Sequence, residues 1–210
     1  NGLMLNADQT VTNLTLTNGD LDLNGKILTI SPTGMLSETA GNTVKGATGK
    51  IITTRDIGVP NALNVAGLGA QITSTQNLGL TTIERFHSVR TGNGNSSIMR
   101  SYNISPANNT GLNAMLKFYY DESEIGTAFE STLKLFRSPN GLANNWVYVG
   151  GISDSINNNV TFTGIDNFAF WTVASDQHPI PVELTSFNAV VKDNIIALSW
   201  KTATETQNKG

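Results

Sequence analysis

An acidic segment near the start of the chain has the residue types and spacing of a calcium site. Within residues 20–25, side-chain oxygens stand at every second position, as in the first half of a calcium-binding loop. The candidate ligands are Asp20, Asp22 and Asn24. The twelfth position of such a loop would be Ser31 instead of Glu, and the intervening leucines also fit a strand whose acids face water. Calcium is the one cofactor that the sequence suggests, and the strand interpretation, which we favour, needs none.

Two other groups of polar residues could act chemically. Residues 121–124 read Asp-Glu-Ser-Glu, and catalysis by such acids would require one buried carboxyl beside an ionised one. A solvated turn at the end of a strand is the simpler interpretation. Arg85 and His87 share one face of a predicted strand, where they could bind a carboxylate or a sugar, or serve only the structure. Scattered Ser, His and Asp residues do not define a catalytic triad.

Aromatic residues at alternate strand positions suggest a surface for carbohydrate. Sugars stack their C–H faces on rings, so a glycan platform would need the rings exposed on one face. The candidate glycan-binding residues are Trp146, Tyr148 and Trp171. The same alternation is typical of aromatic side chains packed in a core, which is the interpretation we favour.

Composition narrows the class of protein further. Of the 210 residues, 39% are hydrophobic and only 14% are charged, and the formal net charge is −3. No stripe of Lys and Arg neutralises phosphates, so we expect no nucleic-acid partner, and no apolar stretch is long enough to span a bilayer. The absence of cysteine excludes disulfides, thiolate metal sites and cysteine nucleophiles. We read the chain, which opens at Asn1 without a signal peptide, as a mature or excised fragment.

The distribution of apolar and turn residues predicts an all-β fold. In residues 1–55, short period-two segments are separated by Asn-Gly, which is typical of hairpins or of a short β-solenoid. A weak echo between residues 14–19 and 21–25 favours the solenoid. Residues 56–176 carry longer strands with short polar links, which predicts an antiparallel, jelly-roll-like β-sandwich.

Alternation within the predicted sandwich indicates which side chains form its core. Leu116, Phe118 and Tyr120 are expected on one face of a strand. Leu133 and Leu135 are expected to share a face of another strand, opposite Lys134 and Phe136.

Residues 177–210 form a third region. The segment His178-Pro179-Ile180-Pro181 is stiff and extended, and it predicts a domain boundary. Two strands are expected after it, at residues 182–191 and 195–201. Since two strands cannot bury a core alone, they either begin a further domain or lie against the sandwich.

The C-terminal region resembles a known kind of module. The start of a fibronectin type III-like module is resembled by residues 181–189 (PVELTSFNA) and 196–208 (IALSWKTATETQN). Most of residues 98–208 resemble this module together with the segment that often precedes it. Such modules are common near the C-terminal end of secreted Bacteroidota proteins, often before the sorting domain of the type IX secretion system. The resemblance implies a truncated fibronectin type III-like module, export by the type IX machinery, and a protein that is secreted or attached to the outer-membrane surface. It implies no catalytic residues.

A short motif that is known from the same group of organisms suggests a modification site. Asp154-Ser155-Ile156 resembles the acceptor pattern of the Bacteroidota O-glycosylation system, which joins Asp, a hydroxyl residue and an apolar residue. Ser155 is therefore a candidate for an O-glycan. An ordinary turn into the asparagines that follow explains the same residues without modification, and we favour it.

These observations predict a non-catalytic structural or adhesive module with surface polysaccharide or other surface proteins as its partners. The alternative is a carbohydrate-binding accessory module of a larger secreted enzyme, which exposed Trp146 or Trp171 would favour. A polysaccharide-cleaving solenoid is a third hypothesis. It would need acids clustered on one face, and residues 1–55 offer too few turns for such a cleft.

Overall fold

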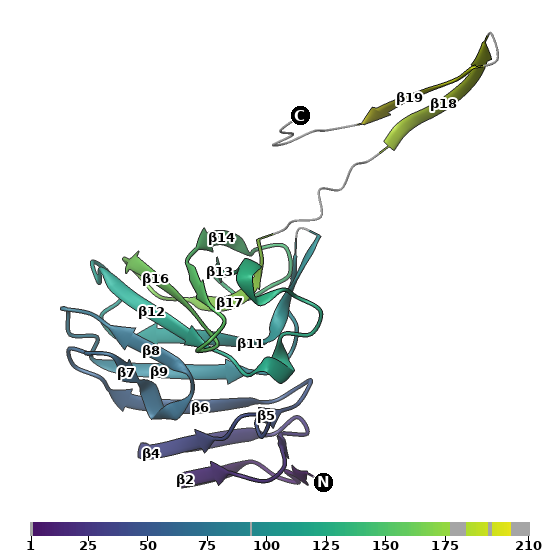
Figure 1. Cartoon of the computed structure of the whole chain (residues 1–210). Helices are drawn as coiled ribbons and strands as arrows, with labels where there is room; N and C mark the ends of the chain where they lie inside the picture. Colours follow the sequence, from purple (N-terminus) through teal and green to yellow (C-terminus); the bar gives the residue numbers. More distant parts are fainter. Residues whose placement is uncertain (1, 93, 177–183, 193–194, 203–210) are drawn as a thin grey trace. The chain divides into compact units, whose positions relative to one another are not determined.

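The computed structural model (Figure 1) describes four stretches of the chain, which are residues 2–92, 94–176, 184–192 and 195–202. These residues are all-β apart from three short 3₁₀ helices. The chain divides into two compact units, residues 1–177 and 178–210, which are described separately. Within the described stretches, no helix is long and apolar enough to cross a membrane.

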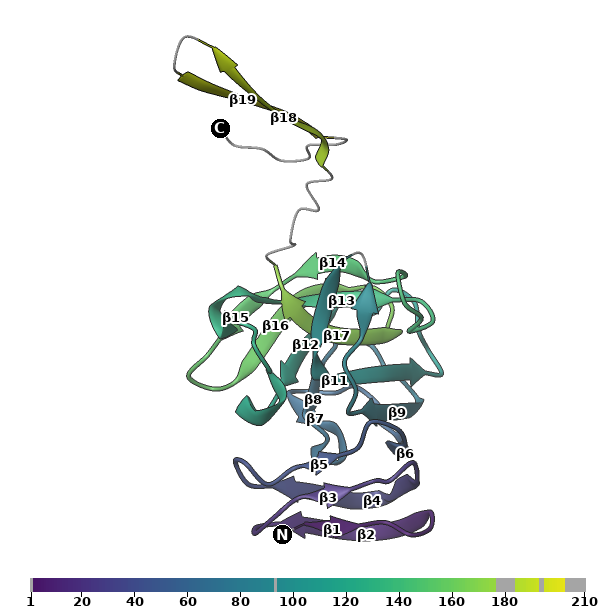
Figure 2. The same cartoon turned by 90° about the vertical axis from the view of Figure 1, so that its right-hand side faces the viewer.

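The strands nearest the N-terminus pair in parallel. Their two ladders are β1-β3-β5 and β2-β4-β6, so each strand pairs with one two places further along the chain. Hairpins, the other arrangement considered for this region, would be antiparallel. Figure 2 shows the successive turns lying one above another. We term these strands the parallel stack: β1 (Leu3–Met4), β2 (Gln9–Leu16), β3 (Leu21–Asp22), β4 (Ile27–Glu38), β5 (Val44–Lys45) and β6 (Lys50–Asp56).

Alternating side chains and left-handed turns explain the local structure of the stack. Leu21, Leu23 and Leu28 are buried, whereas the polar residues between Leu21 and Leu23 and just after Leu23 stay at least partly exposed. Asn24 and Gly25 have φ of 49° and 77°, which Asn and Gly adopt more readily than other residues. The predicted Asn-Gly turn therefore forms here.

A nine-stranded sheet joins the stack to the rest of the first unit. Its order is β14-β13-β17-β11-β9-β6-β4-β2, with β10 paired to β11. Because β6 pairs in parallel with β4 and antiparallel with β9, the pairing changes direction at β6 without interrupting the sheet. Residues 1–55 and 56–176 consequently lie in one compact unit. The strands outside the stack are β9 (Leu80–Phe86), β10 (Thr91–Gly92), β11 (Asn95–Pro106), β13 (Leu133–Ser138), β14 (Val147–Gly150) and β17 (Phe170–Ser175).

A second, antiparallel sheet completes a β-sandwich. Its order is β15-β16-β12-β8-β7. Core side chains come from both sheets: the ring of Tyr102 in β11 meets that of Phe118 in β12 edge-on, with ring centroids 4.8 Å apart. Leu116, Phe118 and Tyr120 are all buried, as their alternation predicted. The strands are β7 (Leu63–Asn64), β8 (Ala70–Thr73), β12 (Ala114–Tyr119), β15 (Ile152–Asp154) and β16 (Asn159–Ile165).

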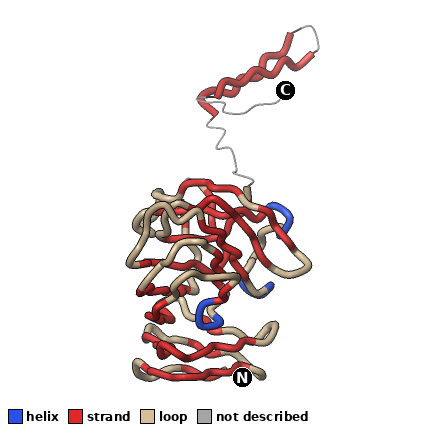
Figure 3. Tube along the Cα trace, turned by 90° about the vertical axis from the view of Figure 1, so that its left-hand side faces the viewer, coloured by secondary structure: helices blue, strands red, loops and turns tan. Residues whose placement is uncertain are grey.

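Three helical turns, drawn as blue segments in Figure 3, interrupt the strands: η1 (Val65–Gly67), η2 (Glu122–Glu124) and η3 (Glu130–Thr132). Gly67 in η1 has φ of 70°, and a Cβ atom there would overlap the carbonyl oxygen of Leu36 in β4. Glycine is therefore required where these two backbones meet. The following residue, Leu68, is buried, and its carbonyl accepts a 2.6 Å hydrogen bond from the Tyr102 hydroxyl.

The second unit contains an antiparallel pair, β18 (Leu184–Lys192) and β19 (Ile195–Thr202). Their register places Phe187 opposite Trp200 and Ala189 opposite Leu198. The side chains of Phe187 and Leu198 are exposed. The predicted stiff segment at residues 178–181 lies outside the described residues.

Candidate functional site

A cluster of buried charges lies where the parallel stack meets the sandwich. Arg85 in β9 is fully buried. Its guanidinium donates two hydrogen bonds of 2.7 Å to the two carboxylate oxygens of Glu38, at the end of β4. The Arg85 Nε atom donates a third, of 3.0 Å, to His87 Nε2. The bidentate pair links β4 to β9, which lie on either side of β6 in the sheet, with the geometry that guanidinium and carboxylate prefer.

A second buried pair continues the cluster. Arg100 in β11 donates from Nε to Glu124, with separations of 3.0 and 2.8 Å to the two carboxylate oxygens. Glu124 also accepts a 2.9 Å bond from the backbone N–H of Asp121, which closes a capping box around η2. The Arg100 guanidinium lies 3.8 Å from Glu38, so both arginines act on one carboxylate.

The charges of these arginines control the titration of their neighbours. Burial alone would raise the pKa of Glu38, but the nearby charges of Arg85 and Arg100 outweigh it and lower that pKa. Burial, reinforced by Arg85 and Arg100, holds the pKa of His87 well below 6.5. His87 is therefore neutral at pH 7, and because Nε2 accepts from Arg85, its proton resides on Nδ1. Among the described residues Nδ1 has no hydrogen-bond partner.

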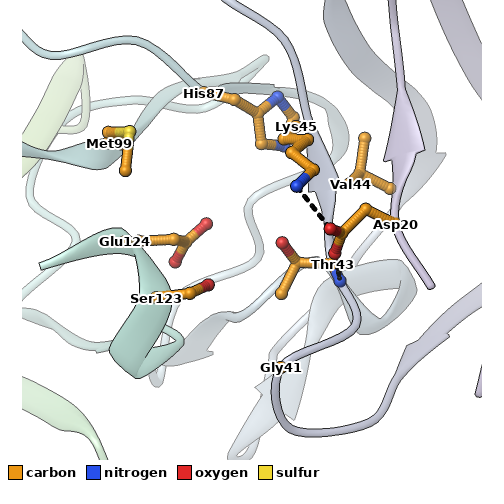
Figure 4. Close-up of a pocket in the computed structure, with 9 residues that line it drawn as sticks. All are labelled: Asp20, Gly41, Thr43, Val44, Lys45, His87, Met99, Ser123 and Glu124. Atoms are coloured by element: carbon orange, nitrogen blue, oxygen red, sulfur yellow. Dashed lines mark hydrogen bonds and ion pairs between the residues drawn. The ribbon is translucent and has the colours of Figure 1, made fainter. Parts of the chain in front are cut away.

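A cavity of about 160 Å³ adjoins the cluster (Figure 4). Figure 4 shows Met99, Ser123 and Glu124 on one side and the Asp20–Lys45 ion pair on the other. Every carboxylate in this wall already has a cationic partner, since Asp20 pairs with Lys45 and Glu124 with Arg100. The wall therefore carries paired charges and hydroxyl groups beside apolar surface.

A second and larger hollow, of about 630 Å³, shares Met99 and Glu124 with the first. It runs over β11 toward the loop between η2 and η3. Its remaining wall includes Val89, Asn95, Ser96, Thr127 and Phe129. Phe129 is 75% exposed. We term the two adjoining hollows the groove.

Comparisons with protein-family models, with curated proteins and with solved structures found no match. The site is therefore interpreted from its own geometry.

The candidate calcium ligands are engaged by other groups. Asp20 accepts from the backbone N–H of Thr43 at 3.0 Å and pairs with Lys45, whose hydrogen bond is the main cause of its lowered pKa. Asp22 accepts from the backbone N–H of Asn24 at 2.8 Å, and the Asn24 amide donates to a backbone carbonyl. A calcium ion would have to displace these donors. In the described part of the chain, no three His, Cys, Asp or Glu side chains are grouped to hold a metal ion.

The three candidate glycan-binding rings do not share an exposed face. Trp171 is 1% exposed and meets Phe168 edge-on in the main core. Trp146 is 7% exposed, and only Tyr148 is open to solvent, at 49%. These three rings therefore do not form a common platform on which a sugar could stack.

The candidate modification site is open. Ser155 is exposed in the turn between β15 and β16, beside Ile156, which is 91% exposed. The Asp154 carboxylate accepts from the backbone N–H groups of Ile156 and Asn157, which holds the turn together. An enzyme could reach the Ser155 hydroxyl without unfolding the turn.

Sequence reasoning missed two features of the site. It placed residues 121–124 in a solvated turn, but Glu124 is 5% exposed and paired with Arg100. The Asp-x-x-Glu spacing, which is that of a capping box, was the available signal. It also missed Phe129, which lies in a loop where no periodic pattern marks it. The alternation of Arg85 and His87 correctly placed both on one face, where Arg85 binds the carboxylate of Glu38.

Proposed function

We propose that the chain is a non-catalytic structural or adhesive module of a secreted, cell-surface bacterial protein. The observation that carries the proposal is the use of the buried charges. Glu38 and Glu124 are each bound by an arginine inside the first unit. A general base must reach a substrate proton, directly or through one water. Here the carboxylates instead hold β4, β9, β11 and η2 together.

Export rests on the sequence resemblance of the C-terminal region to fibronectin type III-like modules of secreted Bacteroidota proteins, which often precede the sorting domain of the type IX secretion system. A cysteine-free chain stabilised by β packing and buried ion pairs is compatible with that route. The same resemblance makes the type IX machinery a partner during export, and makes the cell surface or the medium its destination.

The alternative function is that of a carbohydrate-binding accessory module. The exposed ring of Tyr148 favours it, but the burial of Trp146 and Trp171 removes the larger platform. Binding through these rings would be lost on Tyr148→Ala.

Three measurements test the proposed function. Antibodies against residues 1–177 should label intact cells of the source organism, and beads coated with the chain should be retained on those cells. The purified chain should release no reducing sugar from polysaccharides. Labelling only after cell lysis, or sustained sugar release that is abolished by Glu124→Gln, would contradict the proposal.

A further inference from the structure

We propose that the groove is the binding site of a neutral oligosaccharide. The inference rests on the adhesive part of the proposed function, because it names what would be bound. It assigns the contact to residues outside the aromatic set Trp146, Tyr148 and Trp171.

The size and continuity of the groove suit a chain of sugars. Its larger hollow, of about 630 Å³, falls within the range of roughly 300–1,000 Å³ that small-ligand sites occupy. The smaller hollow adds about 160 Å³. Because Met99 and Glu124 belong to both walls, the two hollows adjoin at these side chains, and a ligand could extend across them from one hollow to the other.

The charges of the groove favour a neutral ligand over an ionic one. Among the described residues of the larger wall, only Glu124 is charged, and it is buried and bound to Arg100. In the smaller wall, Asp20 is paired with Lys45 and His87 is neutral. Neither an anionic nor a cationic ligand would find an unmatched countercharge, so a neutral ligand is favoured.

The remaining side chains match the two surfaces of a sugar ring. Phe129 is 75% exposed and Met99 39% exposed, and both offer apolar surface to C–H faces. Ser96 and Thr127 are exposed hydroxyl residues, and hydroxyl groups can donate to and accept from sugar hydroxyls. This combination of apolar and hydroxyl surface, without an unpaired charge, is the chemistry of a neutral saccharide site.

The test is calorimetric titration of the full chain with cellotetraose, xylotetraose, mannotetraose and laminaritetraose. Trigalacturonate and the trimer of glucosamine serve as anionic and cationic comparisons. At least one neutral tetrasaccharide should bind saturably. Phe129→Ala should weaken that binding about tenfold, the loss expected of a central contact residue.

The matched control is Ile152→Ala, because Ile152 is 77% exposed and lies outside the groove. This variant should bind as the unsubstituted chain does. Since Phe129 is so exposed, its replacement should leave the circular dichroism and melting temperature unchanged, which separates lost binding from lost folding.

Three results would overturn the inference. One is that no neutral tetrasaccharide binds to the folded chain, or that only a charged oligosaccharide does. Another is binding that Phe129→Ala leaves unchanged. The third is binding that Tyr148→Ala abolishes, which would place the site at the surface around Tyr148 instead of in the groove. If coated beads are still retained on cells in any of these cases, the adhesive function stands and only its assignment to this groove fails.

Discussion

The parallel stack and the antiparallel sandwich share one sheet, yet they bury their apolar side chains to different degrees. In the first turn of the stack, Leu5, Val11 and Leu14 are only partly buried. In the sandwich, Leu116 and Leu135 are fully buried between two sheets. In a stack, each turn is covered only by its neighbouring turns, whereas a sandwich closes on itself. The two regions should therefore respond differently to the same substitution.

Ion pairs cross the joint between the regions, in addition to the apolar core that both regions share. Glu38 from the stack meets Arg85 from the sandwich, and Lys50 of β6 pairs with Glu84 of β9 at 2.5 Å. Buried ion pairs add little net stability over well-packed apolar residues, but losing one partner is costly because the other charge remains buried. We interpret these pairs as fixing the position of β4 and β6 against β9.

The largest loss of stability is expected when the central arginine of the joint is removed. Arg85→Met leaves Glu38 buried without its bidentate partner, and we expect the free energy of unfolding to fall by about 3–5 kcal/mol. Urea denaturation followed by circular dichroism measures this. The double variant Arg85→Met/Glu38→Leu should recover most of the loss, and a single variant that loses less than about 1 kcal/mol would show that the joint does not depend on this pair.

The same truncation should cost different amounts of stability in the two regions. Leu116→Ala in the sandwich should cost about 4 kcal/mol of unfolding free energy. Leu28→Ala in the stack should cost about 2–3 kcal/mol, because the first turn beside it is only partly buried and can relax into the cavity. Both leucines are at most 1% exposed, so the pair is matched. Equal losses in urea denaturation would mean that the stack is packed as rigidly as the sandwich.

Acidification should weaken the joint through His87. Its pKa in the folded chain lies well below the unfolded value of 6.5, chiefly because of burial. Between these values the unfolded state binds the proton first, so stability is complete above pH 6.5 and falls as the pH decreases. One such group contributes at most about 1.4 kcal/mol per pH unit.

The measurement is the free energy of unfolding between pH 7.5 and pH 5, above the range where carboxylates dominate. His87→Gln keeps an acceptor for the Arg85 Nε atom, and it should flatten the dependence over this interval. An equally steep dependence in that variant would assign the effect to other groups.

The smallest effect is expected at the surface of the stack. The Lys45 side chain is 58% exposed, so its ion pair with Asp20 is screened by solvent. We expect Lys45→Ala to lower the free energy of unfolding by less than about 1 kcal/mol, with a dependence on salt. A loss as large as that of Arg85→Met would mean that the exposed ion pair contributes as much stability as the buried one, which would contradict this prediction.

The sequence predicted those parts of the fold that depend on local alternation. The period-two pattern around Leu116 and the Asn24-Gly25 turn both have short-range causes, and both are present in the structure. The all-β class follows from such segments repeated along the chain. The pairing of β6 with both β4 and β9 could not be predicted, because alternation does not identify a strand's neighbours.

The candidate site depended on contacts that no spacing reveals. Arg85 and Glu38 are 47 residues apart, and Arg100 and Glu124 are 24 apart. An acid in a polar segment looks solvated until the strand that supplies its arginine is known. The burial of Trp171 was equally undetermined, since alternation places a ring on a face without saying which face is covered.

Gly67 limits which substitutions this chain can accept where the two regions meet. The residue contributes no side chain, yet it is the point at which the loop of the sandwich touches the backbone of the stack. Related chains could therefore exchange the surrounding side chains in compensating sets while position 67 stays glycine. Among related chains, the glycine at this boundary between the two regions should therefore vary less than the charged residues beside it.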